Sequence, residues 1–189
     1  MESKLAPGFL VAAPSLLDPN FKRSVVLLVD HRPEGSLGLV INRVAQISLS
    51  DVLTPLGLQA LSAPAVEGRV MVGGPVAPDT GWLIFEQAGP APDGEEVVRV
   101  SERLAVSASR EVLERLIARG GDERMQLLLG YSGWGPGQLD AEIAQGSWIP
   151  VDFDESIVFD IPAAERWTRA LGLLGIDPAR LTLQPPSEN

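Results

Sequence analysis

The sequence predicts a mixed α+β fold in which residues 1–189 form one domain. Short apolar runs that suit strands are interleaved with amphipathic helical segments, without the regular strand–helix rhythm of a doubly wound sheet. No long polar or low-complexity linker divides the chain. With 189 residues and 45% hydrophobic content, the chain can bury a sizeable core.

The first third of the chain is rich in expected strands. Short β-branched or leucine-rich runs occupy residues 9–13, 24–29 and 37–42. Turn-forming residues separate these runs, and the second separator, Arg32-Pro33-Glu34-Gly35, predicts a hairpin. Ser48 or Ser50 then caps a short helix that runs through Leu56 and ends at Gly57.

The middle of the chain alternates strands, a polar loop and a helix. Strands are expected at residues 69–72 and 82–85, around the turn Gly73-Gly74-Pro75. A polar loop rich in glycine and proline follows at residues 87–96. A helix is expected at residues 109–119, because its apolar side chains recur on one face. These side chains are Val112, Leu113, Leu116 and Ile117.

The segment Gly130–Leu139 has four glycines within eight positions. We expect it to form a shaped loop between a buried strand at residues 125–129 and a helix at residues 137–145. Such a unit directs free backbone N–H groups and the positive end of a helix dipole to one spot. We expect strained backbone at Gly133 and Gly135, while Trp134 either fills the core or lines a site.

The C-terminal part is predicted to contain one more strand and one more helix. Residues 157–159 are apolar and suit a short strand. Asp160 is expected to cap the following helix, which Pro162 opens and which carries Trp167 and Leu171 on its apolar side. Gly175 suits the end of this helix.

Composition excludes several classes of function. The formal net charge of -10 argues against direct binding of nucleic acid or of anionic membranes, which needs clustered Lys and Arg. The chain has no cysteine, so disulfides, thiolate nucleophiles and cysteine-based metal sites are excluded. No apolar run approaches the ~20 residues of a membrane span. A cytoplasmic location is therefore expected.

Four motifs follow one another along the chain. They are Gly8–Pro14 continuing into Asp18–Val26, His31 with Gly35–Arg43, Gly73–Val76, and Gly130–Leu139. In this order they resemble the AlgH/YqgE family of bacterial proteins, collinearly from about residue 5 to 180. The resemblance implies a branched mixed sheet that includes a small closed barrel and is flanked by helices. It implies no established reaction, although one branch is named for the regulation of alginate production.

Two departures from the family pattern stand out. Val44 replaces a proline that often follows the Asn-Arg pair, and Ile84-Phe85 replaces a Leu-His pair. Any family chemistry that needs this second histidine is absent here.

The glycine-rich segment departs from known ligand motifs. A nucleophile elbow needs Gly-x-Ser-x-Gly, whereas Trp134 stands at the last glycine position, and the family also accepts alanine at Ser132. A P-loop needs Lys and Ser or Thr after its final glycine, and the dinucleotide motif needs one more residue between glycines. The segment can still bind a carboxylate, a phosphate or a peptide carbonyl through backbone N–H groups. Alternatively, its glycines only allow close backbone packing.

One histidine and two arginines are further candidates. His31 is the only histidine, which excludes sites that need two histidine ligands. Arg23 precedes one strand of the expected hairpin and Arg43 follows the other, so both lie at the same end. Two neighbouring guanidiniums need an anion or carboxylates between them, and Asp18 and Asp51 are internal candidates for that role.

We therefore expect a non-enzymatic binding or regulatory protein of the bacterial cytoplasm and, by family resemblance, an indirect transcriptional regulator. Its partner is expected to be a protein or a small anionic ligand, with no cofactor, metal, nucleic acid or membrane involved. The alternative is a metal-independent, hydrolase-like enzyme that uses His31 with a hydroxyl or carboxylate partner. The candidate binding residues, none of them assigned a catalytic role, are Asp18, Phe21, Arg23, His31, Asn42, Arg43, Gly73, Gly74, Tyr131, Gly133, Trp134, Gly135 and Gln138.

Overall fold

Strands from the whole chain join in one mixed sheet, which confirms the predicted α+β class. The computed structural model describes residues 4–58, 69–119 and 124–181. Its strands are β1 (Gly8–Ala12), β2 (Val25–Arg32), β3 (Gly35–Val40), β4 (Val44–Ser48), β5 (Arg69–Val72), β6 (Val76–Glu86), β7 (Val98–Arg99), β8 (Leu104–Ser107), β9 (Met125–Trp134) and β10 (Trp148–Val151).

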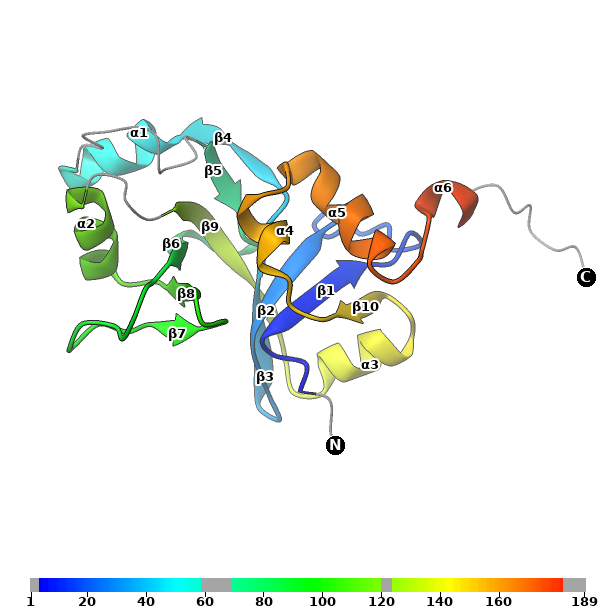
Figure 1. Ribbon diagram of the computed structural model, residues 1–189. Coiled ribbons are helices and arrows are strands. Elements are labelled where there is room, and N and C mark those ends of the chain that lie inside the picture. The colour runs from blue at the N-terminus through cyan, green and yellow to red at the C-terminus, as the bar shows by residue number, and fades with distance from the viewer. Residues whose placement is uncertain (1–3, 59–68, 120–123, 182–189) are drawn as a thin grey trace, which may run out of the picture.

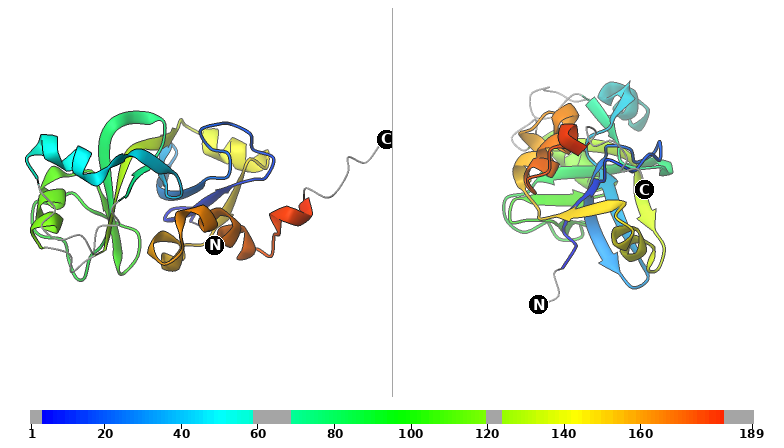
Figure 2. Two further views of the ribbon diagram at one scale, coloured as in Figure 1. Left: turned by 90° about the horizontal axis from the view of Figure 1, so that it is seen from above. Right: turned by 90° about the vertical axis from the view of Figure 1, so that its right-hand side faces the viewer.

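Most of the helices lie in two groups. They are α1 (Leu49–Leu53) with the 3-10 turn η1 (Thr54–Leu56), α2 (Arg110–Ala118), α3 (Gln138–Ala144), α4 (Glu155–Phe159), α5 (Ala163–Gly172) and α6 (Pro178–Leu181). Figure 1 shows α1 and α2 at one end of the molecule and α3, α5 and α6 at the other. The view from above in Figure 2 shows the same separation.

The sheet is branched but open. Its main path runs β10-β1-β2-β3-β9-β6-β8-β7, and β4 and β5 leave this path through the parallel pair of β5 with β9. The branched mixed sheet is therefore as expected. The small closed barrel is wrong, because the two end strands of the path, β10 and β7, do not pair with each other among the described residues.

The predicted hairpin is formed by β2 and β3. His31 lies opposite Ser36 and Arg32 opposite Gly35, so Pro33-Glu34 form the turn. The predicted short helix follows β4: the Ser48 side chain caps α1, and Gly57 ends η1 in a left-handed conformation with φ 71°.

The strand β9 passes through most of the segment that was expected to be a loop. Residues 130–134 continue the strand, in which residues 132–134 pair with β3 and Tyr131 pairs with Val76 of β6. The prediction of an irregular loop at these positions is therefore wrong. Glycines lower strand propensity, but pairing with partners on both sides overrides it here. The expected helix follows as α3, with Gly137 at its N-cap.

Backbones approach very closely where β5, β6 and β9 meet. Gly130 has φ +72°, and a Cβ there would lie 2.4 Å from the carbonyl oxygen of Gly74. A Cβ on Gly73 would lie 2.3 Å from the Gly130 carbonyl oxygen. Strain at Gly133 and Gly135 is not found, because neither has a positive φ and a Cβ would meet nothing nearer than 3.4 Å and 3.8 Å respectively.

The C-terminal part differs from the sequence prediction. Residues 157–159 lie in the helix α4 rather than in a strand, and Asp154 caps this helix by accepting from the backbone N–H of Ser156. A buried apolar triplet does not distinguish the two states. Asp160 does not cap α5: it ends α4 and pairs with Arg124 at 2.6 Å, while Pro162 is the N-cap of α5.

The strands β1 to β3 are buried on both faces, because successive side chains of a strand point to opposite sides. One face contributes Phe9, Val11, Val25, Leu27 and Leu39 to a core with α4 and α5. The other face contributes Leu10, Ala12, Val26, Leu28 and Val40 to a core with Trp134, Leu139 and Trp148. The predicted apolar face of α2 packs in a third core against β6 and β9.

The close approach at Gly130 predicts a large cost for any side chain. Gly130→Ala should lower the free energy of unfolding by more than the ~1 kcal/mol of a positive-φ alanine, because the new Cβ also meets the Gly74 backbone. Urea denaturation measures this loss. Gly135→Ala is the control, and its free energy of unfolding should stay close to that of the parent protein. Equal stability of the two variants would contradict the close backbone approach at Gly130.

Candidate functional site

A basic cavity lies where the end of the β2–β3 hairpin meets α5. Its volume is about 260 Å³. It is lined by Lys22, Arg23, Asn42, Arg43, Ala163, Ala164, Trp167 and Thr168. The sequence prediction that Arg23 and Arg43 lie at the same end of the hairpin therefore agrees with their common place in this cavity.

Local backbone geometry positions Arg23. This residue has φ 55°, a left-handed conformation that a non-glycine residue rarely adopts. The Asn42 side chain stabilises it, because Nδ2 donates to the Arg23 carbonyl oxygen at 2.8 Å and Oδ1 accepts from the Val25 N–H at 2.8 Å. The Arg23 guanidinium stacks over the Trp167 ring, with 5.2 Å between its carbon and the ring centroid.

The Trp167 ring that carries Arg23 is itself fixed. Its Nε1 donates to the Ala12 carbonyl oxygen at 2.8 Å, which ties α5 to β1. Only 6% of Trp167 is exposed. The wall of the cavity is therefore rigid, and this reduces the entropy lost when a ligand is ordered there.

Arg43 is held by the turn before β2. Its Nη1 donates to the Asn20 carbonyl oxygen, and its Nη2 lies 3.4 Å from the Lys22 carbonyl oxygen. Asp18 shapes the same turn by accepting from the Asn20 N–H at 2.8 Å. These contacts are made to neutral carbonyl groups, so they orient the Arg43 guanidinium and leave its charge uncompensated.

The expected internal carboxylates do not pair with the two arginines. Among the described residues, Lys22, Arg23 and Arg43 form no ion pair with an acidic side chain. Asp51 instead accepts hydrogen bonds from the Ser48 side chain and backbone, which lower the pKa of its carboxyl. The N-terminal end of α5 adds a positive dipole at Ala163.

Trp134 belongs to a buried aromatic cluster. Its ring is 6% exposed and lies near Phe21 and Trp148, with centroids 6.3 Å and 5.9 Å away. The indole N–H groups of Trp134 and Trp148 both donate to Glu142 Oε2, at 3.0 Å and 2.9 Å. Gln138 joins this network by donating to Glu142 Oε1 at 2.9 Å.

His31 lies at the other end of the hairpin, beside α3. Its Nδ1 is 2.7 Å from the Ser36 hydroxyl, and its Nε2 is 3.3 Å from Asp140 Oδ1. The side chain of His31 is 22% exposed and that of Asp140 is 63% exposed. Hydroxyl, imidazole and carboxylate are thus in line, the order that a hydrolase uses.

The remaining candidates lie at the branch of the sheet or close to it. Gly73 and Gly74 face the backbone of β9, and Tyr131 packs edge-on against Trp82 at 6.0 Å. Tyr131, Gly133 and Trp134 line a separate open cavity of about 730 Å³ together with Ser36. The Gly135 N–H donates to Gln138 Oε1 at 3.0 Å. The candidate residues therefore do not form one site but lie in separate parts of the structure.

Several residues of these places were missed by sequence reasoning. Ser36 could have been found, because the Pro33-Glu34 turn sets it opposite His31. Asp140 reaches His31 only through the docking of α3, and Trp167 and Thr168 reach the basic cavity only through that of α5. Contacts between such distant segments leave no local signal in one sequence.

Two features are absent from the described parts of the chain. No helix there is long and apolar enough to cross a membrane. No three histidine, aspartate or glutamate side chains there are grouped as ligands of a metal ion.

The fold and the basic cavity define an α+β protein with a branched sheet and a cationic surface pocket. Residues 9–179 match the family DUF179, described as AlgH-like. A UPF0301 protein of Anaeromyxobacter sp. (strain Fw109-5) is 43% identical over 181 residues, which cover 93% of this chain and 91% of that protein. A UPF0301 protein of Methylococcus capsulatus (strain ATCC 33009 / NCIMB 11132 / Bath) is 40% identical over 180 residues, or 95% and 94% of the two chains.

Two solved structures have a similar fold. The solution structure of the AlgH protein from Pseudomonas aeruginosa has a TM-score of 0.76 at 36% identity and covers 100% of this chain and 98% of that one. A crystal structure from Corynebacterium diphtheriae has a TM-score of 0.71 at 23% identity, over 99% and 91% of the chains, and supports the fold alone. The chain belongs to the AlgH-like family, which confirms the resemblance. None of these names states a reaction.

The buried aromatic cluster predicts a structural role for Trp134. Trp134→Ala should lower the free energy of unfolding by ~3–5 kcal/mol, because it removes a large buried ring and leaves a cavity. Trp134→Phe should cost less, since it loses mainly the N–H donor to Glu142. Chemical denaturation measures both, with Leu17→Ala, at a side chain that is 70% exposed, as control. A Trp134→Ala protein as stable as this control would show that the ring is not part of the core.

Proposed function

We propose that the protein is a non-enzymatic binding module of the bacterial cytoplasm that takes up an anionic group in the basic cavity. One observation carries the proposal: three cationic residues line one small cavity without a described acidic partner, in a protein of net charge -10. Basic side chains in an acidic protein ordinarily find carboxylates, as Arg115 does with Glu95 at 2.8 Å. Three like charges around one cavity repel one another, and a bound anion would offset this repulsion.

The chemistry of the cavity supports an oxyanion such as a phosphate or a carboxylate. Guanidinium groups donate in a planar fork that fits both kinds of anion. Lys22 adds a mobile ammonium, and Thr168 brings a hydroxyl that can donate. The volume of about 260 Å³ suits one anionic group of a larger molecule or of a protein partner. Any effect on transcription then passes through that partner and not through DNA.

The proposal predicts that anions stabilise the protein through Arg43. Inorganic phosphate should raise the free energy of unfolding relative to sodium chloride at equal ionic strength, by ~2.7 kcal/mol at a hundredfold excess over its dissociation constant. Arg43→Ala and Arg23→Ala should abolish this gain. Arg32→Ala is the matched control, since Arg32 pairs with Asp30 at 2.9 Å outside the cavity. The proposal fails if all of these variants gain stability from phosphate as the parent protein does.

A second candidate function is hydrolysis, supported by the contacts of His31 with Ser36 and Asp140. In such a reaction the Ser36 oxygen attacks an ester carbonyl while His31 Nδ1 takes the hydroxyl proton, which then goes to the departing alcohol. Water next cleaves the acyl group from Ser36 and restores the hydroxyl. Asp140 is 63% exposed, so its ion pair with His31 contributes little, and anion binding is the better supported function.

The two functions differ in their response to Ser36→Ala. If the protein only binds its ligand, the parent protein and Ser36→Ala should hydrolyse p-nitrophenyl acetate at the same background rate. The control variant Ser156→Ala should show this rate as well. Loss of a serine nucleophile would instead lower the rate by several powers of ten. A drop of that size in Ser36→Ala alone would favour the hydrolase.

A further inference from the structure

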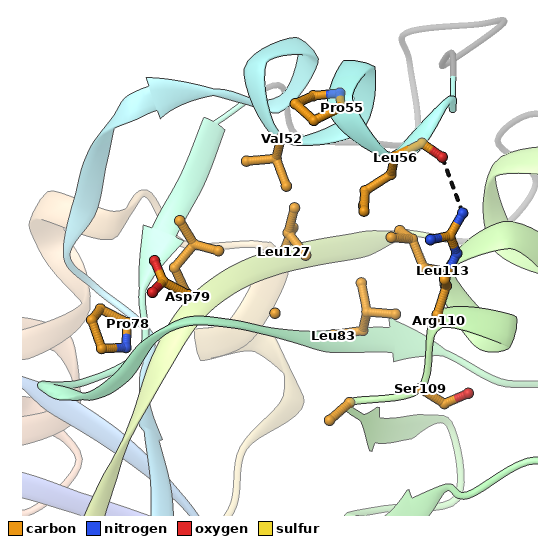
Figure 3. A pocket seen from close by; sticks show the side chains of 13 residues that line it. Val52, Pro55, Leu56, Pro78, Asp79, Leu83, Ser109, Arg110, Leu113 and Leu127 are labelled. Atoms are coloured by element: carbon orange, nitrogen blue, oxygen red, sulfur yellow. Dashed lines mark hydrogen bonds between the residues drawn. The ribbon is translucent and has the colours of Figure 1, made fainter.

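A third cavity lies at the opposite end of the molecule from the basic cavity, between α1–η1, α2 and the sheet. Its volume is about 510 Å³, within the range of roughly 300–1,000 Å³ that is typical of small-molecule sites. Figure 3 shows its apolar side chains pointing into the space between helices and sheet. The apolar lining consists of Val52, Pro55, Leu56, Pro78, Leu83, Leu113, Leu127 and Leu129.

The floor of this apolar cavity is made by two strands. Leu83 lies opposite Leu127, and Gly81 lies opposite Leu129 in the pairing of β6 with β9. Gly81 gives the floor its depth: a Cβ there would meet only the Leu127 Cδ1 atom, at 3.7 Å, which is ordinary contact. The backbone of Gly81 does not require glycine, because its φ is not positive. The missing side chain therefore leaves open space without serving a turn or a backbone crossing.

The two ends of the apolar cavity differ in charge. At one end Arg110 is satisfied, because its Nη2 donates to the Leu56 carbonyl oxygen at 3.0 Å and its Nε to Glu114 Oε1 at 2.7 Å. This hydrogen bond to Leu56 joins α2 to η1 (Figure 3). At the other end, Asp79 is exposed and has no hydrogen bond or ion pair with a described residue. The uncompensated charge of this cavity is therefore negative.

We propose that this cavity binds a small amphipathic amine, with its apolar body on Leu83 and Leu127 and its ammonium group at Asp79. Burial of an alkyl chain is favourable by about 0.8 kcal/mol for each methylene removed from water. The ammonium group supplies a cation that can pair with the exposed Asp79 carboxylate. A fatty acid of the same length places its carboxylate against Asp79, which repels it, or beside Arg110, whose charge Glu114 already offsets. This site is independent of the basic cavity.

The size of the cavity is tested with a neutral fluorescent probe. N-phenyl-1-naphthylamine should bind the parent protein saturably, and Gly81→Leu should weaken binding by about tenfold or more, because the new side chain fills the floor. Thr80→Leu is the matched control, since Thr80 is the exposed neighbour on β6 and does not line the cavity. Gly81→Ala should give an intermediate loss. Circular dichroism checks that each variant is folded, and unchanged probe binding in folded Gly81→Ala and Gly81→Leu would overturn the proposal.

The charge preference is tested by displacement of the same probe below micelle-forming concentrations. Decylamine should displace it at a concentration about tenfold lower than decanoate does. Asp79→Asn should remove this difference, whereas Asp152→Asn, which removes an exposed carboxylate outside the cavity, should keep it. Equal displacement by the two compounds, or a preference that survives Asp79→Asn, would show that the site does not select amines. Phosphate should have no effect on the probe, which separates this test from that of the basic cavity.

Discussion

The fold depends on how closely the backbones of β5, β6 and β9 approach one another at Gly73, Gly74 and Gly130. A side chain at Gly73 or Gly130 would lie within 2.4 Å of a backbone oxygen, so the strands can meet only if these positions carry no Cβ. The crossing lets one strand, β9, serve two parts of the sheet: its first half pairs with β5 and β6 and its last residues with β3. The branched sheet therefore extends towards both ends of the molecule.

The basic cavity and the apolar cavity lie at opposite ends of the molecule, and different helices line them. At one end α5 docks on β1 through Trp167 and brings its N-terminal end beside the cationic turn of Arg23 and Arg43. At the other end, the apolar cavity lies between α1–η1, α2 and the sheet at Gly81. The hydrogen bond from Arg110 to Leu56 links α2 to η1. The two cavities differ in chemistry: one is cationic and small, whereas the other is apolar with a single uncompensated carboxylate.

Part of this architecture could be predicted from local sequence. The hairpin around Pro33-Glu34, the Ser48 cap and the apolar face of α2 follow from turn residues, capping and periodicity. Glycines misled the prediction at residues 130–134, because neighbouring strands on both sides stabilise a segment whose own propensity for β-structure is low. The apolar triplet at residues 157–159 has no readable period, and its helix depends on the Asp154 cap and on burial against α5.

The sequence by itself determined the α+β class, most element positions, the family and the common place of Arg23 and Arg43 at one hairpin end. Only the tertiary structure decided that these arginines have no acidic partner among the described residues, that Trp134 is buried with Trp148 over Glu142, and that Gly81 opens a cavity. The physical reason is the range of the interactions. Turns, caps and amphipathic faces are set by residues a few positions apart, whereas charge compensation, burial and empty space depend on segments that meet only after folding.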